Sequence, residues 1–296
     1  MPVHIEPADP NHPDFVGNAS GVSLREKLSA ADVQAIERGM DRYAVLIWRD
    51  QPLDDETQLA FSRNFGTLEQ ATGDLAQGEQ RRLSTEVNDI SNLAKDGTVL
   101  ARDDRRRLFG LGNMLWHSDS SFKAVPAKYS ILSGRVVPPK GGNTEFADMR
   151  AAWDALDEET KATVEPLVCE HTQIHSRGIL GFTEFTDDER RRFAPVLQRL
   201  VRVHPVTGRK SLFLSSHAGG IVGWPVPEAR ALLRDLTEHA TQRERMHAHV
   251  WQADDLVIWD NRTTMHRARR YDPNERRDLR RTTVACEEAT VEQIAA

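Results

Sequence analysis

Two segments far apart in the sequence carry side chains that could hold one metal ion. The first is the run Leu-Trp-His-Ser-Asp-Ser-Ser-Phe at 115–122, and the second contains His266. Residues two apart on an extended strand point to the same face, so His117 and Asp119 could reach the same ion. Two imidazoles and one carboxylate form the facial triad of non-haem Fe(II) oxygenases, which leaves positions open for other ligands. The spacing therefore predicts an iron site made by His117, Asp119 and His266.

The sequence also offers a competing histidine pair. His-x-Asp is common by chance, and His247 and His249 would also share one face of a strand. We expect His247 and His249 to be ordinary strand residues, because their segment lacks a carboxylate at like spacing. A zinc hydrolase built on these histidines is the chemical alternative, but it would leave the arginines after His266 without a role.

A basic run follows the last candidate ligand. Most of its arginines are typical of a solvated surface, and acidic residues interrupt it, which disfavours nucleic-acid binding. Arg277 and Arg281 are exceptions, because on an extended segment both would share one face with Leu279 between them. Two guanidinium groups entering a barrel need anions, and planar carboxylates suit them. This arrangement suggests two carboxylate ligands, of which one is 2-oxoglutarate.

Composition limits the classes of protein that remain. The chain has 296 residues, 39% hydrophobic and 28% charged, with a formal net charge of -6. This charge argues against a nucleic-acid or anionic-membrane partner. The expected partner, a small anionic molecule, follows from the two arginines instead. The longest apolar run has about six residues, too few for a membrane helix, and the N-terminus does not resemble a secretory signal. Two cysteines make no disulfide framework, so we expect a cytoplasmic protein.

Hydrophobic periodicity predicts a mainly β chain with flanking helices. We expect helices capped by Ser29 and running to about Asp41, and at 55–64, 149–164 and 228–240. The region 68–112 is polar, and within it 102–107 is expected to be solvated and mobile, as in loops that cover active sites. Many short strands favour a sandwich or barrel, with hairpins turning at 207–208 and 253–254. The expected strands are 43–48, 128–137, 167–174, 200–204, 211–215, 246–251, 256–260 and 281–285.

Three ordered motifs make the family recognisable. The run at 115–122, Gly-Gly-Asn-Thr-Glu-Phe-Ala-Asp-Met-Arg-Ala-Ala at 141–152, and Trp-Asp-Asn-Arg through His266 resemble the taurine dioxygenase/2,4-dichlorophenoxyacetate dioxygenase family. The likeness extends from about residue 15 to about 285. It implies a double-stranded β-helix (jelly roll) with helices packed outside. It also implies one dioxygenase domain over 1–296, a mobile lid-like region at about 68–112, and assembly as a homo-oligomer.

The resemblance also implies a role for each motif residue. His117, Asp119 and His266 match the iron ligands, while Thr144 and Arg277 match the pair that binds the far carboxylate of the co-substrate 2-oxoglutarate. Arg281 matches the arginine beside the substrate's acid group. Asn113 matches a pocket residue, and the pocket walls are expected near 88–94 and 216–220.

The implied reaction uses Fe(II), 2-oxoglutarate and O2. Greater likeness to the phenoxyacetate branch favours an aryloxyacetate such as 2,4-dichlorophenoxyacetate, cleaved to a phenol and glyoxylate with release of succinate and CO2. The same chemistry on an alkylsulfonate such as taurine, or on another small aromatic acid, is the alternative. A non-catalytic jelly-roll binding module is disfavoured, because a binder needs no iron and keto-acid site together.

Overall fold

A computed structural model describes residues 2–71 and 81–292, so part of the expected lid-like region, 72–80, lies outside the described residues. The helices are α1 (Ala30–Tyr43), α2 (Asp55–Ser62), α3 (Arg105–Gly110), α4 (Met149–Asp154), α5 (Glu158–Val164), α6 (Gln173–Ile179), α7 (Asp187–Arg192) and α8 (Val226–Ala240), with 3-10 turns η1 (Arg63–Phe65), η2 (Leu111–Met114), η3 (Arg243–Arg245) and η4 (Thr290–Glu292). The strands are β1 (His4–Pro7), β2 (Val16–Ser20), β3 (Val45–Trp48), β4 (Asn88–Ser91), β5 (Ala127–Val136), β6 (Thr144–Asp148), β7 (Val168–His171), β8 (Val196–Arg199), β9 (Val201–Val203), β10 (Lys210–Leu212), β11 (Ala218–Ile221), β12 (Met246–His249), β13 (Leu256–Asp260), β14 (Thr264–Ala268) and β15 (Asp278–Ala285).

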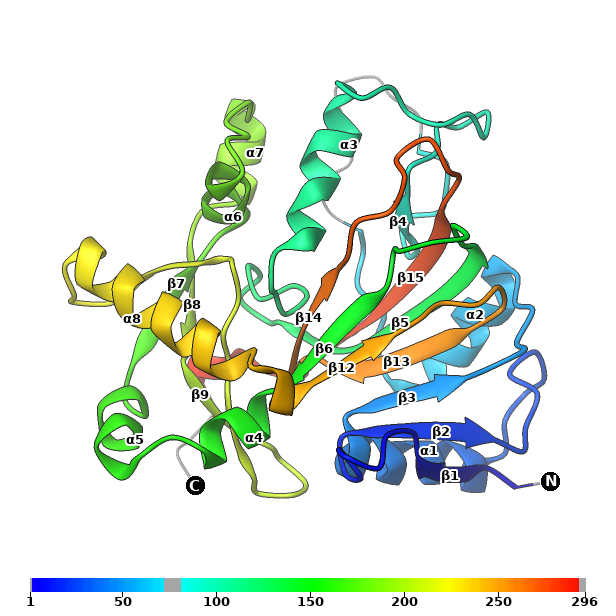
Figure 1. Ribbon diagram of the computed structural model, residues 1–296, viewed down its shortest axis with the longest axis horizontal. Coiled ribbons are helices and arrows are strands. Elements are labelled where there is room, and N and C mark those ends of the chain that lie inside the picture. The colour runs from blue at the N-terminus through cyan, green and yellow to red at the C-terminus, as the bar shows by residue number, and fades with distance from the viewer. Residues whose placement is uncertain (1, 72–80, 293–296) are drawn as a thin grey trace.

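The strands form one large sheet and three small ones. The large sheet has seven strands in the order β1-β2-β3-β13-β5-β15-β4, and the sheet β12-β6-β14 lies beside it (Figure 1). All pairings in these two sheets are antiparallel except β2 with β3. The remaining sheets are β11-β7-β8 and β10-β9. The fold is mainly β with helices, as expected.

Alternating side chains explain why the large sheet has a helix layer on one face only. On β3, Leu46 and Trp48 pack in the cluster that contains residues of α1 and α2. Val45 and Ile47 point to the other face and pack with Phe146 of β6. A strand with both faces buried reads as a continuous apolar run, as in Val-Leu-Ile-Trp. This inner apolar cluster packs beneath the residues of the candidate site.

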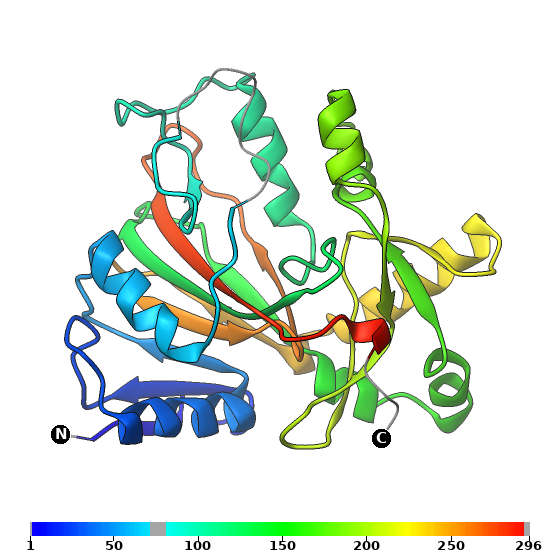
Figure 2. The same ribbon diagram turned by 180° about the vertical axis from the view of Figure 1, so that it is seen from behind.

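A second group of elements builds the other half of the molecule. There α4 and α8 cover β7, β10 and β11 around an apolar cluster that includes Leu200, Leu214 and Leu233. The C-terminal turn η4 packs on β8, where the Thr290 hydroxyl donates to Gln198 Oε1 at 2.6 Å (Figure 2). The short helices α3, α6 and α7 stand together on one side of the molecule (Figure 1).

Several sequence predictions are confirmed. Ser29 caps α1, with its side chain accepting from the Asp32 N–H, and the chain turns at 207–208 between the paired strands β9 and β10. The strand at 43–48 and the helices at 55–64 and 228–240 are also present, with ends shifted by a few residues.

Four predictions about elements are wrong. The helix expected over 149–164 is two helices, because Asp157 caps a new one, α5. The stretch 102–107 is not simply a solvated run, since Asp104 caps α3 and Arg105 pairs with Glu189. Residues 253–254 do not join a hairpin: β12 pairs with β6, and β13 pairs with β3 and β5. The strand expected over 167–174 ends at His171, and α6 follows.

Among residues 2–71 and 81–292, no helix combines the length and hydrophobicity that crossing a bilayer requires.

Candidate active site

Backbone pairing brings two of the three candidate ligands together. His266 lies on β14, and His117 forms an isolated antiparallel bridge with it. The His117 N–H donates to the His266 carbonyl at 3.0 Å, and the His266 N–H donates to the His117 carbonyl at 2.9 Å. A fixed pair of ligands therefore results from residues 149 positions apart in the sequence.

Asp119 reaches the same point in a way that the sequence did not predict. It lies in a turn after His117 rather than on a regular strand, and Ser120 after it has a positive φ of 54°. The Asp119 N–H donates to Asn261 Oδ1 at 3.0 Å, which ties this turn to the segment between β13 and β14. The expectation of an extended His-x-Asp segment was wrong, although both side chains do meet at one place.

The three side chains form a compact donor set. One ligand atom from each of His117, Asp119 and His266 lies within 4.8 Å of the others, and all three residues are buried. His117 Nε2 is 3.7 Å from Asp119 Oδ1, and His266 Nε2 is 3.6 Å from Asp119 Oδ2. These distances are too long for good hydrogen bonds. They fit ligands around one ion, since two ligand atoms each about 2.1 Å from a metal are at most about 4.2 Å apart.

The protonation states suit metal binding. Burial lowers the pKa of His117, and burial together with His117 lowers that of His266 well below its usual value, so both imidazoles are neutral. Nδ1 of His117 lies 2.7 Å from the Leu115 carbonyl, which fixes the proton there and leaves Nε2 facing Asp119. Burial alone would raise the pKa of Asp119, but Arg281, the two histidines and the Ser130 hydroxyl together outweigh this and lower it to about 2. Two neutral nitrogens and one carboxylate match what an Fe(II) facial triad requires.

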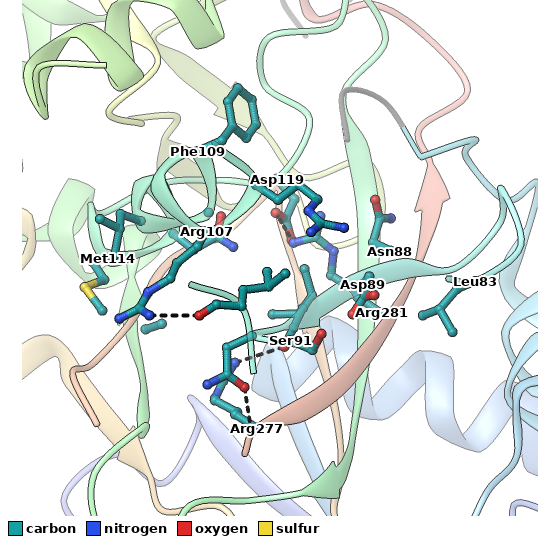
Figure 3. Close-up of a pocket in the computed structure, with 18 of the residues that line it drawn as sticks. Leu83, Asn88, Asp89, Ser91, Arg107, Phe109, Met114, Asp119, Arg277 and Arg281 are labelled. Atoms are coloured by element: carbon teal, nitrogen blue, oxygen red, sulfur yellow. Dashed lines mark hydrogen bonds and ion pairs between the residues drawn. The ribbon is translucent and has the colours of Figure 1, made fainter. Parts of the chain in front are cut away.

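The donor set opens onto a cavity of about 270 Å³. Phe109, Phe122 and Met114 contribute apolar lining, and His117 and Asp119 lie in its wall. Figure 3 shows Asp119 beside Arg281 on one side of this cavity, with Arg107 and Met114 on another. A cavity of this size with an aromatic wall can take a small, flat organic molecule.

A small adjoining cavity of about 30 Å³ holds the remaining motif residues. Thr144, Arg277 and His266 line it, and Asn113 and Arg281 line both cavities. Arg277 is buried, and its guanidinium has no carboxylate partner among the described residues; it donates to the Ile90 carbonyl at 3.2 Å and lies over the Tyr271 ring. Burial lowers the pKa of Arg277, yet arginine stays charged in proteins. A buried, unpaired guanidinium next to a metal site is suited to a ligand carboxylate.

Thr144 is oriented by a neighbour that sequence reasoning missed. The Trp251 indole N–H donates to Thr144 Oγ1 at 2.9 Å, and both residues are buried. A hydroxyl that accepts this bond keeps its own hydrogen available as a donor. Trp251 follows β12, which pairs with β6 so that His249 faces Thr144. Only the pairing of β12 with β6 identifies Trp251 as a neighbour of Thr144, and the sequence alone does not reveal this pairing.

Arg281 lies closer to the metal ligands than expected. Its Nη1 donates to Asp119 Oδ1 at 2.5 Å, and Asp119 is the one hydrogen-bonding partner of the Arg281 side chain among residues 2–71 and 81–292. Arg281 thus contacts both the carboxylate ligand and the larger cavity.

The cavity lining agrees with the wall expected at 88–94 and includes one residue of the wall expected at 216–220. Asn88 through Leu93 contribute, and His217 is the lining residue of the second segment. The His217 ring lies 6.2 Å from that of His117 and 5.0 Å from that of Phe122. Gln173 and Arg177 of α6 also line the cavity, and no sequence signal marked them because only tertiary packing brings α6 here.

The competing histidine pair has structural partners. His249 Nε2 lies 3.1 Å from Asp255 Oδ2, and His247 Nδ1 lies 3.7 Å from Asp9 Oδ2. In the described part of the chain, the one cluster of at least three potential metal ligands is His117, Asp119 and His266.

The fold and this site define a non-haem, 2-oxoglutarate-dependent dioxygenase. The chain belongs to the family described as taurine catabolism dioxygenase TauD, TfdA family, which matches residues 4–283.

Individual relatives agree with the family. The chain is 48% identical over 276 residues to an alpha-ketoglutarate-dependent 2,4-dichlorophenoxyacetate dioxygenase of Cupriavidus pinatubonensis, covering 93% of this chain and 96% of that protein. It is 37% identical over 289 residues to a (S)-phenoxypropionate/alpha-ketoglutarate-dioxygenase of Sphingobium herbicidovorans, covering 95% of each. The crystal structure of AAD-2 in complex with Mn(II) and N-oxalylglycine superposes with a TM-score of 0.94 at 58% identity, covering 98% of this chain and all of that one.

Proposed function

We propose that this enzyme hydroxylates a small aromatic carboxylate, an aryloxyacetate such as 2,4-dichlorophenoxyacetate, with His117, Asp119 and His266 as its iron ligands. The observation that carries the proposal is the buried triad at the wall of a cavity that also presents arginines and aromatic rings. Relatives whose names specify phenoxy acids support the substrate class.

The co-substrate is assigned to the side of the site that Thr144, Arg277 and His266 line. In this proposal Arg277 forms a charge-assisted pair with the far carboxylate of 2-oxoglutarate, and the Thr144 hydroxyl donates to the same group. The Arg277 guanidinium, which is buried and has no carboxylate partner among the described residues, supports this assignment, as does the hydroxyl oriented by Trp251. A relative that binds N-oxalylglycine, a dicarboxylate of similar length, agrees with it.

The substrate fits the larger cavity. Arg281 and Asn113 are proposed to face the acid end of the substrate, while Phe109 and Phe122 receive its ring. Because Arg281 also donates to Asp119, an acid group held by Arg281 would lie next to the metal ligands. The carbon between the acid and the ether oxygen would then be the one nearest the reacting centre.

The residues of this chain position the reactants and shield them from water. When bound, Fe(II) with 2-oxoglutarate and O2 supplies the oxidising chemistry, in which 2-oxoglutarate becomes succinate and CO2. Hydroxylation of the carbon next to the ether oxygen gives a hemiacetal. Its collapse breaks the carbon–oxygen bond and releases a phenol and glyoxylate.

A product assay tests the proposal. Iron-loaded enzyme with 2-oxoglutarate and O2 should release one phenol and one succinate for each phenoxyacetate consumed, and His266→Ala should release neither. His247→Ala is the matched control and should keep activity, because His247 lies outside the triad. Sulfite from taurine without phenol from any aryloxyacetate would contradict the proposal and support the alkylsulfonate alternative. Succinate without either product would point to another small aromatic acid.

Three broader assignments remain predictions. We infer a double-stranded β-helix, supported by the two main sheets that enclose the inner apolar cluster. We also infer a single dioxygenase domain over 1–296 and assembly as a homo-oligomer. Analytical ultracentrifugation checks the last, and a monomer at micromolar concentration would contradict it.

A further inference from the structure

A hydrogen-bonded chain behind Asp119 holds this carboxylate from its buried side. The Ser130 hydroxyl on β5 donates to Asp119 Oδ2 at 2.7 Å. Asn261 Nδ2 donates to the same Ser130 oxygen at 2.9 Å, so that the one hydroxyl hydrogen is left for Asp119. Ser130 and Asn261 are both fully buried.

The orientation of the Asn261 amide is determined by its partners. Its Oδ1 accepts from the Asp119 N–H and from Trp259 Nε1, each at 3.0 Å, while its Nδ2 faces Ser130. Exchanging the amide oxygen and nitrogen would set donor against donor at the two N–H groups. Asn261 therefore binds both the backbone of Asp119 and the hydroxyl that holds its side chain.

The same chain reaches a second ligand. The Trp259 ring, which donates to Asn261, lies 4.5 Å from the His266 ring between centroids. His266 is in turn bridged to His117 by two backbone hydrogen bonds. Trp259, Asn261 and Ser130, all of them buried, thus connect the three ligands.

We propose that Ser130 and Asn261 are positioning residues of the metal site, which hold the carboxylate plane of Asp119 in the rotation that an ion needs. The inference rests on the proposed iron site. Arg281 holds the other carboxylate oxygen from the cavity side, where a substrate acid can compete for it, whereas Ser130 holds Oδ2 from a buried strand. Outer partners of this kind typically contribute tenfold to hundredfold in metal affinity.

Ser133 on the same strand provides a matched control. It is also buried, and its hydroxyl donates to Gln58 Oε1 at 2.6 Å. Ser133 therefore does not belong to the hydrogen-bonded chain that holds Asp119. Ser130→Ala and Ser133→Ala each delete one buried hydroxyl from β5. Mn(II) binding to the metal-free enzyme, measured from the EPR signal of free Mn(II), reports affinity without turnover. The thermal midpoint of the metal-free protein reports general damage.

The expected result is a Mn(II) Kd raised about tenfold to hundredfold in Ser130→Ala and unchanged in Ser133→Ala. Ser130→Cys, which keeps a weak donor at nearly the same size, should fall between Ser130→Ala and wild type, and it covers the case in which the alanine variant fails to fold. Equal affinities in Ser130→Ala, Ser133→Ala and wild type would overturn the inference. His117→Ala distinguishes failure of the positioning role from failure of the metal site. Full Mn(II) binding by that variant would reject the proposed metal site itself.

Discussion

At the scale of single residues, the site is marked by a buried guanidinium that has no carboxylate partner among the described residues. A buried guanidinium costs several kcal/mol unless a counter-charge is present. Arg277 bears this cost beside the triad, whereas the buried Arg150 and Arg262 each have an aspartate partner two residues away. The contrast supports an anionic ligand for Arg277.

Arg277→Ala should raise the apparent KM for 2-oxoglutarate at least roughly tenfold, because a charge-assisted contact to a carboxylate contributes about 1.5–3 kcal/mol. Steady-state kinetics with 2-oxoglutarate varied at saturating substrate measure it. Arg276→Ala is the matched control, since Arg276 is exposed and adjacent. Equal KM values for wild type and Arg277→Ala would refute the assignment.

Trp251→Phe should also raise the KM for 2-oxoglutarate, by about 3- to 10-fold, through the lost orientation of the Thr144 hydroxyl. The effect should vanish when Thr144→Val is already present, because the two residues act through one hydroxyl. A double-mutant cycle measures this coupling. Trp48→Phe removes a buried indole whose N–H has no partner among the described residues, and it should leave KM unchanged. Additive effects of the two substitutions would contradict the proposed orientation.

At the scale of elements, the turn between β13 and β14 sets the geometry of the site. Asp260 ends β13 and binds the backbone N–H and the guanidinium of Arg262, with His204 Nε2 at 3.4 Å. An equivalent Asp148–Arg150 pair ends β6, which is hydrogen-bonded to β14. These two aspartate–arginine pairs stabilise the turn that carries Asn261 and leads into His266.

Asp260→Asn should destabilise the protein by about 3–5 kcal/mol at pH 7, because it leaves the buried Arg262 unpaired. Burial opposes ionisation of Asp260, but Arg262 and His204 outweigh it and lower its pKa below the usual range. A lowered folded-state pKa stabilises above the unfolded-state value of about 3.9 and progressively less as the pH falls below it. The difference between wild type and variant should therefore shrink as the pH falls from about 4 to about 2.

Urea unfolding at several pH values measures the difference in the free energy of unfolding between wild type and Asp260→Asn. The matched control is Asp235→Asn, since Asp235 and its partner Arg234 are exposed and such pairs contribute little. A difference in the free energy of unfolding that stays constant over this pH range would show that Asp260 acts through packing rather than through its charge.

The sequence predicted single helices and strands better than it predicted which strands pair with one another. The Ser29 cap and the apolar run at 45–48 depend on nearby residues, and both predictions were confirmed. The hairpin expected at 253–254 failed because turn residues do not reveal that β12 belongs to a different sheet from β13. The triad residues were identified from their types and motif, but the turn that aims Asp119 depends on Asn261, 142 residues away. Long-range hydrogen bonds of this kind leave no local pattern.

At the scale of the whole molecule, charge is distributed unevenly. The chain carries a net charge of -6, yet among the described residues nine cationic and three acidic side chains line the larger cavity. A cleft lined by one sign of charge concentrates ligands of the opposite sign. The distribution thus favours small anions at the site while the surface as a whole repels polyanions.

Added salt should therefore weaken substrate binding without slowing the reaction of bound substrate. Between about 0.01 M and about 0.5 M ionic strength the screening length falls from about 30 Å to a few ångströms, so the KM for phenoxyacetate should rise severalfold at constant kcat. Binding of phenoxyacetamide, which has the same ring without the charge, should be insensitive to salt. Arg107→Gln should flatten the salt dependence, because Arg107 lines the cavity, whereas Arg234→Gln on the exposed surface should not. Steady-state kinetics and equilibrium titrations across this salt range decide the matter. If phenoxyacetate and its amide respond equally to salt, the cavity charges do not attract the substrate, and the arginines serve only to hold bound groups in place.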